Sequence, residues 1–317
     1  MLQVIRHGIR ISWSSRKRPR NSKGRLVGQE HLEPYLQDYL SRGVIIPANP
    51  KHFCLCFPVA KKSGKLRLTT DFTPINTLSK PPPHFSLISG DKVGCKYIQR
   101  GDWMCTVDLS DAYNHLCISK HDAKFAGLQW NGKSYIWQGM GFGLKSAPWE
   151  FTTVLRAALK PLRGVIRLVD YLDDLLILGR SPQECAAHTA TLISWLEILG
   201  FTINREKSSL SPSQEVEYLG WRWSSKDGTQ HLPVDKQQRI SVEIRKMLNR
   251  TRWSLRETQR LQGLINWLLG ALPEFEKREF NFDPFNIWYN STPTFAYHRY
   301  AATSFQVQKR GARRGGG

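Results

Sequence analysis

An apolar stretch interrupted by three aspartates is the feature that most restricts how this chain can fold. Residues 165–179 read VIRLVDYLDDLLILG, in which two short apolar segments flank the adjacent Asp173 and Asp174. Each segment has the length and composition of a buried strand, and aspartate is common in β-turns. The stretch therefore predicts a hairpin whose tip carries both aspartates. Adjacent like charges repel, so a hairpin of this kind is favoured if something neutralises them.

A second acidic strand is predicted earlier in the chain. Residues 104–113 read MCTVDLSDAY, in which apolar and polar positions alternate and Asp108 falls on the polar face. If this strand packs beside the hairpin, three carboxylates converge: Asp108, Asp173 and Asp174. Mg²⁺ takes oxygen ligands, and two such ions can catalyse phosphoryl transfer. The spacing alone leaves both a polymerase and a two-metal nuclease open.

The charge of the chain favours a polyanionic partner. The 317 residues include 46 Lys and Arg against 26 Asp and Glu, a net charge of +20. Such a balance favours nucleic acid first and an anionic membrane second. The sequence contains neither an apolar run of the ~20 residues that span a membrane nor an apolar signal core, so we expect an intracellular protein with no membrane partner.

The N-terminal segment is strongly basic. Residues 1–27 contain no acid, and they include the run RKRPR at positions 16–20. This composition predicts a flexible basic arm. The run could also be a nuclear-import signal or a phosphate-binding patch, so a nuclear or a cytoplasmic location stays open.

The remaining pattern predicts an α+β fold with an antiparallel sheet, because strands and helices are interspersed without regular βαβ alternation. Asn131-Gly132 predicts a hairpin turn, Ser181 a helix N-cap, EYLGWRW (217–223) one strand, and residues 235–273 two helices with basic outer faces. The six cysteines show no zinc spacing and are expected to be reduced core thiols.

Several motifs together resemble those of reverse transcriptases. YLDD (171–174) resembles their Y-x-D-D box, VDLSDAY (107–113) their first catalytic motif, and GFGLKSAPWEFT (141–152) a motif usually written PFGL..AP..F. LRLTTDFTPIN (66–76) resembles their fingers motif, and GFTINREKS with EYLGWRW resembles the two motifs after the catalytic hairpin. The wording is most similar to DIRS-like (tyrosine-recombinase) retrotransposons.

The resemblance implies a role for each matching residue. Asp108, Asp173 and Asp174, with the main chain of Leu109, would hold two Mg²⁺ ions, Mn²⁺ being an alternative, and Lys207 would act as general acid. The residues expected to bind the incoming dNTP are Lys61 or Lys62, Arg67, Asp111, Ala112, Tyr113, Phe142 and Gly143. Tyr113 would exclude a 2′-hydroxyl. The expected primer grip is Tyr218, Leu219, Gly220 and Trp221.

The resemblance also implies a right-hand architecture with fingers, palm and thumb. Fingers and palm would occupy residues 28–230, with fingers at about 28–100 and 126–155 and palm at about 101–125 and 156–230. The helical thumb would follow at 231–273. Residues 274–317 are expected to be an irregular basic tail, too short for the ribonuclease H domain that normally follows in the family.

The implied function is RNA-directed DNA synthesis on an RNA template from a DNA primer, through an RNA–DNA hybrid. The alternative is a catalytically decayed, nucleic-acid-binding remnant of a retroelement. Three positions depart from the family pattern: Gly141 stands where proline is usual, Asp170 stands where an apolar residue is usual, and Asn114-His115 follow Tyr113.

Overall fold

The computed structural model describes residues 2–20, 29–60, 66–88, 93, 96–249 and 254–270. The chain forms two compact units. Unit 1 comprises residues 1–89 and 102–216, and unit 2 comprises residues 90–101 and 217–317. Both contain helices and antiparallel sheets, which confirms the predicted α+β class.

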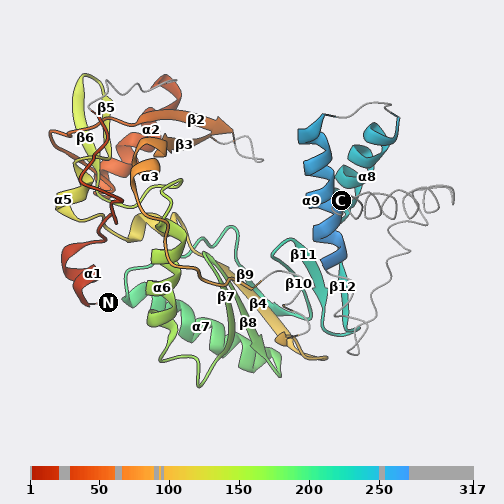
Figure 1. Ribbon diagram of the computed structural model, residues 1–317. Helices are drawn as coiled ribbons and strands as arrows, with labels where there is room; N and C mark the ends of the chain where they lie inside the picture. The colour runs from red at the N-terminus through yellow and green to blue at the C-terminus, as the bar shows by residue number, and fades with distance from the viewer. Residues whose placement is uncertain are drawn as a thin grey trace, which may run out of the picture. The chain divides into compact units, whose positions relative to one another are not determined.

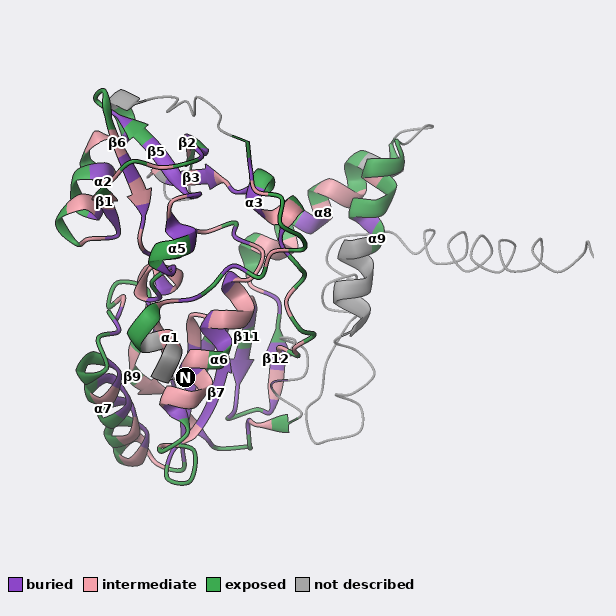
Figure 2. Ribbon diagram, turned by 60° about the vertical axis from the view of Figure 1, so that its left-hand side comes forward, coloured by how far each residue is buried: buried purple, intermediate pink, exposed green. Residues whose placement is uncertain are grey.

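The largest sheet in the described part of unit 1 has four antiparallel strands, and we call it the central sheet (Figure 1). Its order is β7 (Arg167–Tyr171), β8 (Asp174–Gly179), β4 (Trp103–Asp108) and β9 (Ser209–Ser213). Helix α7 (Pro182–Ile198) packs on β8, β4 and β9, and α6 (Ala147–Leu159) contributes buried side chains to the same core. Leu175, Leu176 and Ile177 of β8 are completely buried, and β7 is coloured mainly purple in Figure 2.

The rest of unit 1 consists of two smaller sheets and short helices. One sheet has the order β1-β6-β5 and the other is the hairpin β2-β3. The strands are β1 (Ile45–Pro47), β2 (Leu55–Ala60), β3 (Leu66–Asp71), β5 (Gly127–Trp130) and β6 (Lys133–Trp137). The helices are α1 (Leu2–His7), α2 (Gln29–Ser41), α3 (Thr73–Leu78), the 3₁₀ turn η1 (Ala112–His115) and α5 (Lys120–Ala123).

Unit 2 combines a three-stranded sheet with two helices. The strands β10 (Glu215–Tyr218), β11 (Trp221–Ser224) and β12 (Thr229–His231) follow one another in the sheet. The helices are α8 (Val234–Leu248) and α9 (Leu255–Gly270), which confirms the two helices predicted there. In α8, Arg239, Arg245 and Lys246 are exposed, as the predicted basic outer face requires.

Local sequence signals account for several element boundaries. Asn131 and Gly132 both have positive φ and form the two-residue turn between β5 and β6. The Ser181 hydroxyl accepts a hydrogen bond from the Glu184 N–H and caps α7. The prediction of one strand over EYLGWRW is wrong, because Leu219 and Gly220 both have positive φ and turn the chain between β10 and β11.

The N-terminal segment differs from the flexible arm that its charge predicts. Residues 2–20 include a helix, and Ile9 and Ile11 are buried in the core of unit 1. The Ile9 N–H donates to the Cys117 carbonyl at 2.8 Å, and the Ser119 N–H donates to the Ile9 carbonyl at 2.8 Å. The sequence did not predict that this segment packs on unit 1, because Ile9 and Ile11 are single apolar residues among polar ones.

Four of the predicted core thiols, Cys54, Cys56, Cys105 and Cys185, are buried and free, whereas Cys117 is exposed and does not fit that prediction. No helix in the described ranges has both the length and the apolar character needed to cross a bilayer. The predicted tail at 274–317 lies outside the described residues, and the predicted boundaries of fingers, palm and thumb stay predictions.

Candidate active site

The two acidic segments meet at one end of the central sheet. Asp108 ends β4 and lies opposite Asp174, which begins β8, in antiparallel register. Leu172 and Asp173 form the turn between β7 and β8, and the Leu109 N–H donates to the Asp173 carbonyl at 2.9 Å. The predicted hairpin and its packing beside the Asp108 strand are therefore confirmed.

The turn that carries Asp173 has an unfavourable backbone conformation. Leu172 has a φ of +52°, in the left-handed region that residues with a side chain rarely adopt. The β7–β8 ladder on one side and the Leu109–Asp173 hydrogen bond on the other hold this conformation. Such strain is maintained only where the surroundings determine it, and it is common at functional sites.

The carboxylates are close enough to affect one another electrostatically. Burial raises the pKa of Asp174 to about 6, the charges of Asp173 and Asp108 add to this rise, and Lys207 opposes it. The Lys207 ammonium nitrogen lies 3.5 Å from Oδ1 of Asp108. The Lys207 side chain is 65% exposed and the Asp108 side chain 12% exposed, so the lysine can move away while the carboxylate stays in place.

The donor set suits a hard cation. All three side chains offer carboxylate oxygens, and their mutual repulsion is the condition that a bound divalent ion relieves. As these side chains stand, the described part of the chain contains no group of three acidic, histidine or cysteine residues gathered for one ion. The nearby positive charge is the Lys207 ammonium, which is paired with Asp108.

The raised pKa of Asp174 predicts a specific pH dependence of stability in metal-free protein. An unfolded aspartate titrates near pH 4, so between about pH 4 and pH 6 the folded state holds a proton that the unfolded state has lost. The contribution of Asp174 to the free energy of unfolding therefore falls as the pH rises through this window. We expect Asp174→Asn to remove that fall, measured as urea midpoints from pH 4 to 7 with EDTA. A wild type and variant that differ by the same amount at every pH would contradict the assignment.

Two aromatic side chains predicted to line the nucleotide pocket are in contact. The ring of Tyr113 lies 4.9 Å from that of Phe142 and 5.7 Å from that of Phe151, measured between centroids. Burial raises the pKa of Tyr113 to about 12, and the Asp173 charge adds to this, so the phenol is neutral near the carboxylates. Asp111, in the same loop, has a φ of +47° and pairs with Arg42 at 2.9 Å.

Asn76 fixes the loop that carries Phe142 and Gly143. Its amide nitrogen donates to the Gly143 carbonyl at 2.8 Å, and its amide oxygen accepts from the Lys145 N–H at 2.8 Å. The Lys145 ammonium also donates to the Ser79 carbonyl at 2.8 Å. Asn76 belongs to the predicted fingers motif, but the motif assigns it no role. Its position in α3, a short helix with proline in its first turn that directly follows the β2–β3 hairpin, is a sequence signal for such a role.

The glycine at position 141 has a packing explanation. A Cβ atom at Gly141 would lie 2.6 Å from Cε2 and 2.8 Å from Cζ of Phe72, a side chain that is 1% exposed. We expect Gly141→Ala to lower the free energy of unfolding by roughly 1–3 kcal/mol, the usual effect of overpacking. Gly164→Ala is the matched control, because a Cβ there meets no atom within 4 Å.

A double-mutant cycle tests the cause of that effect. Phe72→Leu removes the ring that the added methyl group would meet, so Gly141→Ala should cost less in the Phe72→Leu background, as measured by urea unfolding. Equal costs in both backgrounds would show that the ring is not responsible.

His115, which departs from the family pattern, connects the Tyr113 turn to a neighbouring segment. Its Nε2 accepts from the Thr202 N–H at 3.0 Å, so Nδ1 carries the proton and donates to the Ala112 carbonyl at 3.1 Å. Burial lowers the pKa of His115, which favours this neutral form. The imidazole thereby positions the turn that carries Ala112 and Tyr113.

Asp170, the second departure, is a buried ion-pair partner. It is 7% exposed, and its carboxylate pairs with Arg156 at 2.7 Å and with Arg163. Arg156 also donates to the Ser86 carbonyl at 3.2 Å. Asp170 therefore lies on the other face of the sheet from Asp174 and ties the β7–β8 hairpin to α6 and to the extended segment at residues 80–88.

The remaining predicted site residues lie either outside the described residues or in unit 2. Lys61 and Lys62 lie outside the described residues, and so does the side chain of Arg67, whose backbone belongs to β3. The predicted primer grip, Tyr218 to Trp221, is the β10–β11 turn of unit 2, with Tyr218 and Trp221 buried. The Lys236 ammonium donates to the Gly220 carbonyl at 2.9 Å and supports this turn.

Comparisons with known proteins agree with this geometry. The family model described as reverse transcriptase (RNA-dependent DNA polymerase) matches residues 59–223. The chain is 26% identical over 247 residues to the Pro-Pol polyprotein of simian foamy virus type 1, which covers 78% of the chain and 20% of the polyprotein. It is also 26% identical over 213 residues to the Gag-Pol polyprotein of gibbon ape leukemia virus, which covers 61% of the chain and 12% of that polyprotein.

Solved structures share the fold. A foamy viral protease–reverse transcriptase in complex with double-stranded DNA superposes with a TM-score of 0.69 at 21% identity, over 82% of this chain and 44% of that one. A complex of the foamy viral enzyme with an RNA/DNA hybrid gives a TM-score of 0.65 at 20% identity, over 81% and 33%. The expected polymerase fold is thereby confirmed, and the chain spans about a fifth of the foamy virus polyprotein. With more than half of its residues matched by the family model, the chain belongs to the reverse transcriptase family.

Proposed function

We propose that this chain is the polymerase part of a retroelement and that it performs RNA-directed DNA synthesis by two-metal nucleotidyl transfer. One observation carries the proposal: Asp108 and Asp174 are register partners at adjoining strand ends, with Asp173 in the turn between β7 and β8. This arrangement brings together oxygen ligands from chain segments about 65 residues apart, as a metal-dependent phosphoryl-transfer site requires.

The residues have distinct parts in this mechanism. Asp108, Asp173 and Asp174, with the main-chain carbonyl of Leu109, would hold two Mg²⁺ ions, or Mn²⁺ in their place. Ions held there would supply Lewis-acid chemistry for activation of the primer 3′-hydroxyl and for charge stabilisation on the leaving pyrophosphate. Lys207 is exposed beside Asp108, so its ammonium is suited to donate a proton to the pyrophosphate.

The nucleotide would enter beside Tyr113. The Tyr113 ring, packed against Phe142, would tolerate a deoxyribose and exclude a 2′-hydroxyl by steric contact. The main chain of Asp111 and Ala112 lies in the turn that His115 holds and is suited to contact the triphosphate. Arg67 and Lys61 or Lys62, at the β2–β3 hairpin, would bind its phosphate oxygens.

The proposed substrates are an RNA template, a DNA primer and dNTPs. The related foamy viral enzyme has been crystallised with double-stranded DNA and with an RNA/DNA hybrid, as the titles of those structures state. The net charge of +20 supports such a partner. The wording of PPPHFSLISG and SLRETQRLQGLINW supports an origin in a DIRS-like retrotransposon. The proposed location is intracellular, either nuclear, with RKRPR as the import signal, or cytoplasmic.

Primer extension tests the proposal. A labelled DNA primer is annealed to an RNA or a DNA template of the same sequence and incubated with dNTPs and either Mg²⁺, Mn²⁺ or EDTA. We expect extension on RNA with either metal and none with EDTA. Tight binding of the hybrid without extension under any metal condition would instead support the catalytically decayed remnant. Metal-dependent cleavage without extension would support a nuclease.

A further inference from the structure

The N-terminal segment of unit 1, distant in sequence from the carboxylate cluster, carries several exposed cations. We name residues 6–20 the N-terminal basic strip. Its exposed cations are Arg6, Arg10, Arg16, Lys17 and Arg20, while Ile9, Ile11 and Pro19 between them are buried. Within the described residues, none of the five cations forms an ion pair with a carboxylate. Their charge is therefore available to an external partner.

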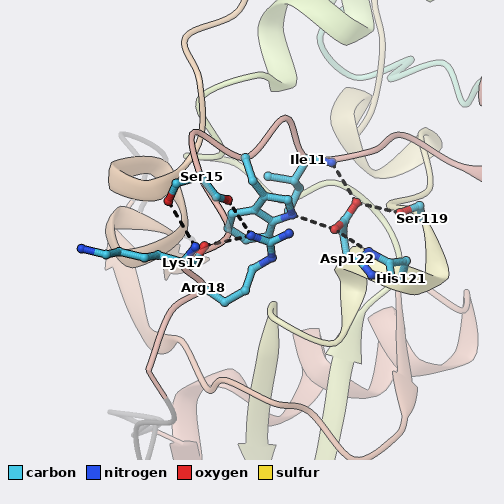
Figure 3. Close-up of polar contacts among 8 residues, drawn as sticks. Ile11, Ser15, Lys17, Arg18, Ser119, His121 and Asp122 are labelled. Carbon is cyan, nitrogen blue, oxygen red and sulfur yellow. Dashed lines mark hydrogen bonds and ion pairs between the residues drawn. The ribbon is translucent and has the colours of Figure 1, made fainter.

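Asp122 anchors the strip to the body of unit 1 (Figure 3). Its Oδ2 accepts from the Ile11 N–H at 3.0 Å, and its Oδ1 accepts from the Trp13 indole N–H at 2.9 Å. The Ser119 hydroxyl also donates to Oδ2 at 2.9 Å. Burial opposes ionisation of Asp122, which is 1% exposed, but these hydrogen bonds and that of His121 hold its pKa below the usual value.

The turn within the strip is closed by its own contacts. The Arg18 guanidinium lies 4.5 Å from the centroid of the Trp13 ring and donates to the carbonyls of Ser15 and Lys17, each at 2.9 Å. The Lys17 N–H donates to the Ser15 hydroxyl at 3.1 Å. Figure 3 shows these contacts of Arg18 and Lys17. The Arg18 side chain thus stabilises the turn, while Arg16 and Lys17 are exposed.

Hydrogen bonds to neighbouring segments add further cations beside the strip. The Lys80 N–H donates to the Ser12 carbonyl at 2.6 Å. The Ser119 N–H, next to Lys120, donates to the Ile9 carbonyl. The ring of His52, next to Lys51, contacts the Arg20 carbonyl at 2.6 Å. All three lysines are exposed. The segments 2–20, 48–60, 72–88 and 117–126 contain a single carboxylate, that of Asp122, and it is buried.

We propose that the N-terminal basic strip, together with Lys51, Lys80 and Lys120, is a second nucleic-acid contact surface that binds the phosphate backbone outside the polymerisation site. The proposal rests on the nucleic-acid substrate of the proposed function. Phosphates are favoured over a lipid surface because the apolar side chains of the strip point into the core, whereas membrane-surface segments present an apolar face to the lipid. Docking also fixes the backbone that carries the cations before binding, so less conformational entropy is lost.

The first test removes charge from the strip. The triple variant Arg10→Gln, Arg16→Gln, Lys17→Gln is compared with a matched control, Lys133→Gln, Lys160→Gln, Arg180→Gln, whose three cations are exposed on other elements of unit 1. Fluorescence anisotropy measures the dissociation constant of labelled single-stranded RNA and of an RNA/DNA hybrid at several salt concentrations, without nucleotides.

For each phosphate that the variant no longer neutralises, we expect the slope of log K against log salt to fall by about 0.7 on single strands and about 0.9 on duplex. The strip variant should therefore bind tenfold or more weakly at low salt, whereas the control should change much less. Equal changes in the two variants would overturn the proposal. Binding to phosphatidylserine–phosphatidylcholine vesicles is measured for the same variants. If the strip variant binds these vesicles more weakly but binds RNA as well as the wild type does, the proposal is overturned in favour of a lipid surface.

The second test keeps the cations and disturbs their docking. Asp122→Asn raises the net charge by one, so charge alone predicts tighter binding, whereas loss of the anchored geometry predicts weaker binding. Near-ultraviolet circular dichroism checks that the variant is folded. If it is not, Trp13→Phe replaces it, because this change removes the indole N–H and keeps a ring beneath Arg18.

Tighter binding by a folded variant in this second test would overturn the docked surface. The two proposals can fail separately. If the protein extends primers but the strip variant binds RNA as tightly as the control variant does, only the inference about the strip is wrong. If the strip variant binds RNA more weakly but the wild type extends no primer, only the proposed polymerase activity is wrong.

Discussion

Replacing Asp173 by asparagine is expected to abolish nucleotide incorporation while the central sheet stays folded. The substitution removes one negative charge from the carboxylate cluster but keeps the Asp173 carbonyl that accepts from the Leu109 N–H. The side chain belongs to the turn and not to the β7–β8 ladder, so the backbone hydrogen bonds of both strands are unaffected. We expect a loss in the rate of single-nucleotide incorporation of about 10³-fold or more, equivalent to about 4 kcal/mol of transition-state stabilisation.

Glu206→Gln is the matched control for that experiment. It removes one negative charge from an exposed position and should leave incorporation close to that of the wild type. Urea unfolding of both variants shows whether the fold is intact. Incorporation by the Asp173 variant at the wild-type rate, from a folded protein, would remove Asp173 from the catalytic site.

Replacing Arg167 by methionine is expected to destabilise unit 1 strongly. The Arg167 guanidinium forms two hydrogen bonds of 2.8 Å with the two carboxylate oxygens of Asp102, which is 3% exposed. Without the arginine, the Asp102 charge is buried without its bidentate partner, and losses of this kind are about 3–5 kcal/mol. The free energy of unfolding from urea titration measures the effect.

An exposed ion pair provides the control. Arg205 is 61% exposed and pairs with Glu197, which is 46% exposed, so Arg205→Met should cost no more than about 1 kcal/mol. Adding Asp102→Leu to the Arg167→Met variant should recover part of the stability, because no buried charge then remains at that position. Equal losses at Arg167 and Arg205 would show that burial does not govern the pair.

The carboxylate site was predictable because its signals are local and strongly patterned. The alternation around Asp108 predicts one strand, and the apolar segments on either side of Asp173 predict two more. Because these strands are apolar enough to be buried, they are expected to pair in one sheet. Asp170 was not predictable in the same way. Its partners Arg156 and Arg163 lie on α6 and in the turn after it, and only the packing of α6 brings them to the strand.

The same distinction applies elsewhere in the chain. The break between β10 and β11 depends on positive φ at Leu219 as well as Gly220, and leucine gives no such signal in a sequence. The roles of Asn76 and His115 depend on main-chain groups at Gly143 and Thr202. Such side-chain to backbone contacts are invisible to pattern reasoning because every residue has the same main-chain donor and acceptor.

The anchoring of the N-terminal basic strip by Asp122 has a consequence for biosynthesis. Ile11 and its partner Asp122 are 111 positions apart, so the strip can dock only after residues near 122 have left the ribosome. At typical synthesis rates of 5–20 residues per second this interval is roughly 5–20 s. During that time the nascent chain exposes arginines and lysines without an acid among residues 1–27, next to ribosomal RNA and its own message. We expect the strip to engage RNA transiently before it docks, so that the order of synthesis delays folding of unit 1.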